Sequence, residues 1–261
     1  MQSPEKKSMK LRSTFPIQQL LFLATCGLLL AGRDARAQGQ PAVVKQKAGA
    51  AQQGVITGVT ASGVSFQLAA GGSITIPLNQ IEYVQMAPPP EYGLAQQAIA
   101  QKDVPKAAAL IGAVAAKYKG LPIDWAQQAT ALAGFLALQS GDIAKADGAF
   151  RDFGRFYPAA VEGKIGTAAI AAAKKDFATA KALIAPLVEE ALKQKDVPVA
   201  SRFAYSRALY ISGQVKESEN DLPGALEDYL RTTTIFYHDA AAVAAAQTRA
   251  DELRKNKVAV P

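Results

Sequence analysis

The pattern of apolar and polar residues changes once along the chain, from a period of two to a helical period. Within residues 53–87, apolar side chains alternate with polar ones in two runs separated by a glycine turn. The apolar positions are Val64, Phe66 and Leu68, then, after Gly71 and Gly72, Ile74, Ile76 and Leu78. Such alternation between turn residues predicts short strands. We therefore expect a small β-module of four to five strands over residues 53–87.

The segments around this module have no strand pattern. Residues 38–52 are rich in Gln, Ala, Lys and Gly and show little periodicity, which is typical of a flexible spacer. Residues 88–90 are three prolines, which are stiff and lack backbone donors, so they predict a linker. From Glu91 onward the chain is rich in alanine and helix-periodic, which predicts an α-helical repeat domain over residues 91–257.

A five-residue frame, Asp-apolar-x-x-Ala, recurs four times in the helical region. The frames begin at Asp103, Asp142, Asp176 and Asp221 and end at Ala107, Ala146, Ala180 and Ala225. The alanines are 39, 34 and 45 residues apart, a repeat length typical of stacked helical hairpins. Each Asp is expected to cap a helix by accepting hydrogen bonds from its first free amides. Each Ala is expected to lie where a neighbouring helix passes close.

Residues near the frames extend this interpretation. Gly141 and Asn220, each just before a frame, suit the positive φ angle that ends a helix. A fifth copy begins at Asp196, but its spacing predicts that it opens the first helix of a hairpin rather than the second. Asp239 is expected to cap a last helix over residues 240–256, whose basic C-terminal half could seal the end of a solenoid.

The second copy of the frame carries information about family. Its surroundings include a glycine in the first helix, a Gly-Asp turn, an aromatic residue in the second helix and a terminal proline. These residues are Gly134, Gly141, Asp142, Phe150, Phe153, Tyr157 and Pro158. The arrangement resembles a tetratricopeptide repeat (TPR), and residues 150–158 resemble repeats of bacterial envelope TPR proteins. The β-module is similar in pattern to a small SH3-like or Sm-like barrel. The expected fold is mainly α, a TPR-like helical-hairpin solenoid preceded by the β-module.

The TPR resemblance implies a groove for a protein partner. In a TPR-like superhelix the first helices of the hairpins line the concave face. Alignment of the repeats carries this role to five positions. They are Gln128, Phe135, Gln139, Arg207 and Tyr210. For Phe135 and Tyr210 the alternative interpretation is ordinary core packing.

Residues 1–37 predict an export signal. A basic lead is followed by a mostly apolar run over residues 17–30, and Ala35-Arg36-Ala37 has the small-x-small pattern of signal peptidase sites. Cleavage is therefore expected between Ala37 and Gln38, giving a periplasmic or secreted protein. The alternatives are an uncleaved anchor over residues 15–32, although a bilayer span needs about 20 apolar residues, or a lipid attached to Cys26, the only cysteine.

The distribution of charge argues against nucleic acid as a partner. The chain carries a formal charge of +7, but residues 1–37 hold six of its 29 basic residues and two of its 22 acidic ones, which leaves +3 for the rest. Residues 54–86 contain no Lys or Arg, so the β-module lacks the cations that neutralise phosphates. The expected partner is another envelope protein or a peptide, with membrane contact only through the export segment.

Few residues suggest catalysis. His238 is the only histidine, which rules out a site built from several histidines. The adjacent acidic pairs at 189–190, 227–228 and 251–252 point about 100° apart on a helix, so we interpret them as solvated faces. We expect no catalytic, cofactor or metal site, and a non-enzymatic scaffold or adaptor in the bacterial cell envelope. The alternatives are a membrane-tethered structural subunit of an envelope complex and a cell-wall-acting enzyme.

Overall fold

The computed structural model describes residues 40–60, 62–194, 196–197 and 201–260. The predicted export signal, its cleavage site between Ala37 and Gln38, and the alternative anchor over residues 15–32 lie outside these residues. Within them, no helix has both the length and the apolar character needed to cross a membrane.

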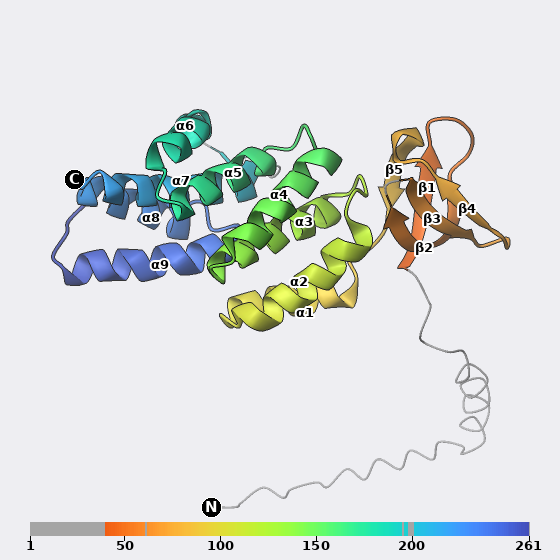
Figure 1. The fold of residues 1–261 in the computed structure, drawn as a ribbon, viewed down its shortest axis with the longest axis horizontal. Coiled ribbons are helices and arrows are strands. Elements are labelled where there is room, and N and C mark those ends of the chain that lie inside the picture. The colour runs from red at the N-terminus through yellow and green to blue at the C-terminus, as the bar shows by residue number, and fades with distance from the viewer. Residues whose placement is uncertain (1–39, 61, 195, 198–200, 261) are drawn as a thin grey trace, which may run out of the picture. The chain divides into compact units, whose positions relative to one another are not determined.

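The first described elements form an antiparallel sheet of five strands in the order β4-β3-β2-β1-β5 (Figure 1). The strands are β1 (Gln40–Gln46), β2 (Gln52–Thr60), β3 (Gly63–Leu68), β4 (Ser73–Ile76) and β5 (Ile81–Gln85), with a short 3-10 helix, η2 (Leu78–Gln80), before β5. Val44, Ile56, Val64, Phe66 and Ile76 are buried in its core. The prediction of a small four- to five-stranded module is confirmed.

The prediction of a flexible spacer over residues 38–52 was wrong, because residues 40–46 form β1. This strand lies inside the sheet and pairs with β2 on one side and β5 on the other. Ala42 and Val44 point into the core, and Lys45 forms an ion pair with Glu82 at 3.0 Å. With only two buried positions, β1 has too short an alternation to be recognised without its neighbours.

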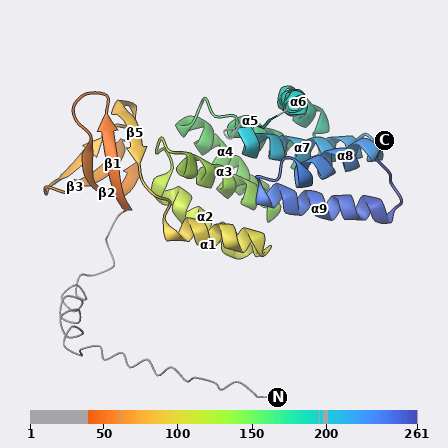
Figure 2. The same ribbon diagram turned by 180° about the vertical axis from the view of Figure 1, so that it is seen from behind.

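In the described part of the chain, nine helices follow the sheet, and the first eight form four hairpins (Figures 1 and 2). The hairpins are α1 (Pro90–Ala100) with α2 (Val104–Tyr118), α3 (Asp124–Gln139) with α4 (Ile143–Phe156), α5 (Glu162–Ala173) with α6 (Phe177–Lys193), and α7 (Arg202–Ser218) with α8 (Leu222–Thr234); α9 (Ala240–Lys255) is last. The prediction of a mainly helical solenoid of hairpins after a β-module is confirmed. Pro90 belongs to α1 rather than to the linker, since a first-turn residue needs no amide.

Each of the four frames begins the second helix of a hairpin. The Asp carboxylates accept hydrogen bonds from the amides of Lys106, Lys145, Thr179 and Gly224 at 2.9–3.2 Å. The frame alanines are fully buried. The residue before each Asp has a φ angle between 60° and 78°; these residues are Lys102, Gly141, Lys175 and Asn220. The positive φ predicted for Gly141 and Asn220 is confirmed, and the two lysines adopt it as well.

The other two predicted caps differ in outcome. Asp196 does not open α7, which begins at Arg202 with Ser201 at its N-cap, so that prediction was wrong. Asp239 caps α9 by accepting from the amides of Ala241 and Ala242. The frame at Asp196 therefore does not provide the cap of α7, which begins six residues later.

The sheet shares its apolar core with α2 and α3. Tyr118 and Trp125 are buried in the same cluster as Val44, Ile56 and Phe66. The Trp125 indole donates a hydrogen bond to the Met86 carbonyl oxygen at 3.0 Å, and its ring meets Tyr118 edge-on at 5.3 Å. A five-stranded sheet of this size is marginal alone, so this contact stabilises it.

Candidate partner-binding surfaces

Four of the five predicted groove residues line one small cavity between the first helices of the hairpins. Phe135 and Gln139 come from α3, and Arg207 and Tyr210 from α7; the remaining walls include Ala169 of α5 and the N-terminal half of α9. The cavity has a volume of about 140 Å³. Because one water takes up about 30 Å³ of the liquid, this space holds a few waters or one side chain, not a peptide.

Gln128 lies apart from the other four. Its Oε1 accepts a hydrogen bond from the Tyr92 hydroxyl at 3.1 Å, beside a second hollow of about 50 Å³. Burial raises the pKa of the Tyr92 phenol. The Gln128 amide oxygen is thus bonded within the protein.

Arg207 is engaged inside the protein. Its guanidinium donates two hydrogen bonds to the Asp239 carboxylate, at 2.6 and 2.8 Å, and both side chains are buried. The guanidinium carbon lies 4.2 Å from the centre of the Phe135 ring, and that ring packs edge-on against Phe150. Because Asp239 is also the cap of α9, one carboxylate joins α7 to the start of the last helix.

The last helix covers the inner face that was predicted to hold a peptide. Helix α9 packs against α8, α7 and α1, and Figures 1 and 2 both show it running beside α7 and α8. Ala241 is buried together with Ile99 and Leu136. The inner face therefore carries a segment of its own chain, which the repeat alignment could not indicate. Phe135 is a buried core aromatic, while Tyr210 is half-buried.

A buried acid in the last hairpin was missed. The interpretation of the Glu227-Asp228 pair as solvated was wrong for Asp228, which is fully buried. One carboxylate oxygen accepts a hydrogen bond from the Ser212 hydroxyl at 2.6 Å and lies 2.7 Å from the Lys216 ammonium. Ser212 and Lys216 are four residues apart on α7, so they lie on one face of that helix and meet the same acid. This ion pair joins α7 to α8.

An open crevice of about 810 Å³ lies between α4, α5 and α6. Its floor is one face of α5, its walls come from α4 and α6, and the α4–α5 loop closes one end. The residues from α5 are Gly163, Lys164, Thr167, Ile170 and Ala171, followed by Lys174 at its C-cap; those from α4 and α6 are Asp147, Phe150, Arg151, Gly154 and Leu183. Ala169 and Ala173, which line the inner cavity, lie on the other side of α5. We call this hollow the outer crevice.

Small residues and one aromatic ring explain why the outer crevice is open. The Phe150 ring lies between Gly134 of α3 and Gly166 of α5, where an added Cβ would collide with it. Helix α4 therefore lies close to α3 and α5. On the crevice side, the space next to Gly154 is empty out to 4 Å from an added Cβ. No large side chain of the described residues fills the gap towards α6.

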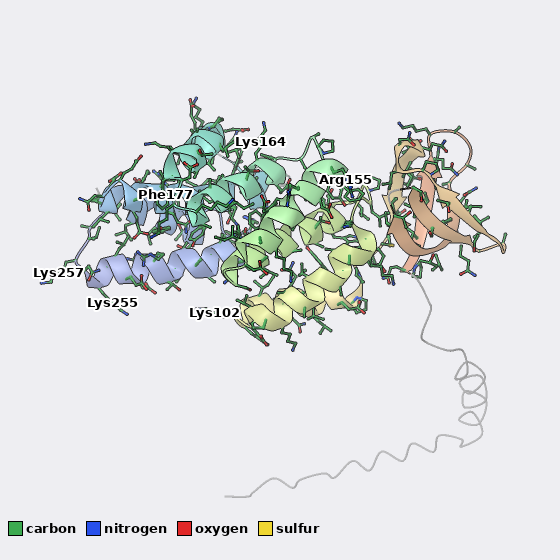
Figure 3. All side chains as sticks on the ribbon, viewed as in Figure 1. Lys102, Arg155, Lys164, Phe177, Lys255 and Lys257 are labelled. Carbon is green, nitrogen blue, oxygen red and sulfur yellow. The ribbon has the colours of Figure 1, made fainter. Side chains whose placement is uncertain are left out.

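Charge is distributed unevenly around the outer crevice. Asp147 pairs with Arg151 at 3.2 Å, and Asp176 caps α6. Hydrogen bonds from Thr179, first from its side chain and then from its amide, lower the pKa of Asp176. None of the ion pairs among the described residues includes Lys164 or Lys174. Figure 3 shows Lys164 on the side of α4–α6 and Lys255 on the side of α9.

Groups suited to chemistry do not converge in the part of the chain that the structure describes. There, no cluster of three or more His, Cys, Asp or Glu side chains could hold a metal ion. The His238 ring stacks on Tyr237 with 4.4 Å between centroids, and its buried Nδ1 has no hydrogen-bond partner among the described residues. Burial, and after it the charge of Arg202, lowers the pKa of this imidazole.

Comparison with known proteins assigns the chain to no family. No family model matches the chain, and neither a curated protein nor a solved structure does. Function therefore has to be inferred from the two surfaces described above.

Proposed function

We propose that the protein is an exported, non-enzymatic scaffold or adaptor that holds another protein or a peptide in the bacterial cell envelope. The observation that carries the proposal is the outer crevice, an open hollow of about 810 Å³ with an apolar floor and a charged rim on a solenoid of helical hairpins. Solenoids of this kind present extended surfaces to other proteins. The basic lead, apolar run and Ala35-Arg36-Ala37 pattern of the N-terminus support export.

The outer crevice supports partner binding better than the inner face does. On the inner face, Arg207 is already bonded to Asp239 and the cavity is about 140 Å³. In the outer crevice, the partly exposed Val161 and Leu183 offer apolar contacts, and Thr167 and Lys164 add polar groups. An apolar centre inside a polar rim is the usual composition of a protein interface.

The size of a stable interface adds a requirement. Specific complexes bury about 1,200–2,000 Å² in total, more than the floor of one crevice. A partner seated in the outer crevice therefore also covers the exposed sides of α4 and α6 next to it. Binding energy is expected to concentrate at the crevice, where side chains lose the most contact with water.

Photo-crosslinking from within the crevice tests this function. A photoactivatable residue at Thr167 is expected to give a discrete adduct with one partner in intact envelopes. Thr248 on α9 is the matched control: like Thr167 it is exposed, and in both residues the hydroxyl donates to the carbonyl four residues earlier at 3.0 Å. The proposal fails if Thr167 gives no adduct, or only those that Thr248 gives.

A further inference from the structure

The floor of the outer crevice is a helix face with no described helix packed on it. Gly163, Thr167, Ile170 and Lys174 are spaced by four, three and four residues, so they form one stripe along α5. From Gly163 to Lys174 the stripe is about 16 Å long at 1.5 Å per residue. A helix of about eleven residues would match this length.

The walls of the outer crevice favour a helical occupant over an extended one. The floor and both side walls are α-helices, whose backbone amides and carbonyls are mostly bonded within each helix, and only one end is closed by the α4–α5 loop. An extended segment in the crevice would therefore lose water from its own backbone groups without gaining partners for them, which is costly. A helix satisfies its backbone internally and needs only side-chain contacts.

The rim of the crevice favours an acidic occupant. The carboxylates of Asp147 and Asp176 are engaged by Arg151 and by the start of α6, whereas Lys164 and Lys174 take part in none of the ion pairs among the described residues. These lysines lie near the two ends of the α5 stripe.

We infer that the outer crevice binds an amphipathic helix of a partner protein, about eleven residues long, with acidic side chains near both ends. The inference rests on the proposed scaffold function and names the chemistry of its partner. The apolar face of the partner helix packs on the partly exposed Val161 and Leu183, and its acids pair with Lys164 and Lys174. This is recognition of an amphipathic helix in a groove, with a charge pattern that selects the partner.

Two designed peptides test the inference against the folded chain of residues 38–261. Both are 16-residue, side-chain-stapled helices with the same Leu/Ala face; one has Glu and the other Lys at the polar positions. The staple is needed because short free helices are marginal in water. In fluorescence anisotropy at low salt, the acidic peptide is expected to bind at least about tenfold more tightly than the basic one, and to weaken as salt rises.

Charge-reversal variants locate the binding. The double variant Lys164→Glu with Lys174→Glu is expected to weaken the acidic peptide at least about tenfold. The double variant Lys106→Glu with Lys255→Glu is the control, because these exposed lysines also lie in the first and last turns of helices, outside the crevice. It changes the net charge equally and is expected to alter binding less than about twofold.

A substitution that fills the crevice with a large side chain tests the inference independently of charge. Thr167→Trp is expected to abolish binding of the acidic peptide, whereas Thr248→Trp leaves it unchanged; helical circular dichroism verifies that both variants fold. The inference is overturned if the acidic peptide does not bind, or binds the crevice variants as well as the parent. If the peptide experiment fails but Thr167 still crosslinks a partner in envelopes, the inference of an acidic helix is wrong and the proposed scaffold function is kept. If Thr167 gives no crosslink either, both the acidic-helix inference and the scaffold function are wrong.

Discussion

At the scale of single residues, the Arg207–Asp239 pair is the most consequential contact. Asp239 caps α9 and Arg207 lies against the Phe135 ring, so one buried pair involves α3, α7 and α9. A buried charge pair adds little compared with apolar residues of the same volume, but removal of one partner leaves an uncompensated charge in the interior. The Arg207–Asp239 pair therefore matters most when it is broken.

Replacement of Arg207 tests this. Arg207→Met is expected to lower the free energy of unfolding by about 3–5 kcal/mol, because the Asp239 carboxylate stays buried without its cation. Urea denaturation measures the change. Arg254→Met, at an exposed arginine in the last turn of α9, should change stability by less than about 0.5 kcal/mol.

A second substitution shows whether the unpaired charge is the cause. Asp239→Asn, added to Arg207→Met, removes the charge and keeps a side-chain acceptor for the α9 amides, since Asn is also a good cap. Part of the lost stability should return. A double variant as unstable as the sum of its parts would contradict this account.

At the scale of the elements, the repeated frame shows what local sequence can predict. The Asp carboxylate, the positive φ before it and the buried Ala after it all lie within six residues, so the turn and the start of each second helix follow from short-range chemistry. The copy at Asp196 has the same letters but lies six residues before α7. The N-cap of α7 is Ser201, not Asp196.

Paired alanine substitutions separate these two situations. Asp142→Ala is expected to cost about 1 kcal/mol, the usual contribution of an N-cap side chain, and Asp196→Ala less than about 0.5 kcal/mol. Thermal unfolding followed by circular dichroism in the helical band compares the two variants. Equal losses would mean that Asp196 has a structural role beyond its matching sequence.

The caps also give stability a dependence on pH. The folded-state pKa of Asp176 is lowered, so its cap stabilises fully above the unfolded value of about 3.9 and is lost as pH falls through the lower folded value. Asp176→Asn should therefore flatten the pH dependence of stability in this acid range, which urea denaturation at a series of pH values would measure.

Long-range packing explains what could not be predicted. Strand β1 has two buried residues, and only its pairing with β2 and β5 makes it a strand. Alignment of the repeats predicts that the groove positions on α3 and α7 face the same groove. Four of the five predicted residues do line one cavity. Its closure by α9 depends on contacts of Ala241 with residues over a hundred positions earlier, such as Ile99. No short pattern encodes such a contact.

At the scale of the whole molecule, one tryptophan reports on the contact between sheet and helices. Trp125 is the only tryptophan in the chain, and it packs in a cluster that includes Val44 and Phe66 of the sheet. Its hydrogen bond to Met86 crosses from α3 to the end of the β-module. Its emission therefore depends on whether the sheet is folded against α2 and α3.

This shared core predicts cooperative unfolding of the sheet and the adjoining helices. In urea, Trp125 emission and helical circular dichroism should give the same midpoint, and Trp125→Phe should lower the midpoint by removing the hydrogen bond to Met86. The smaller aromatic ring would keep most of the apolar contact, which makes this substitution a mild probe. A red shift in emission at urea concentrations well below the loss of helix would show that the sheet detaches first.

The attachment of α9 also determines how the chain responds to mechanical load. A pull on the C-terminus would separate α9 from its neighbours turn by turn, from Lys255 towards Ala240, against mostly alanine-sized contacts. The bonds from Arg249 of α9 to Glu217 of α7 would be loaded first, and the tension would then reach Asp239 and its bonds to Arg207. A tether anchored beyond α9 would therefore meet two force thresholds, first at the Arg249–Glu217 pair and then at the Arg207–Asp239 pair.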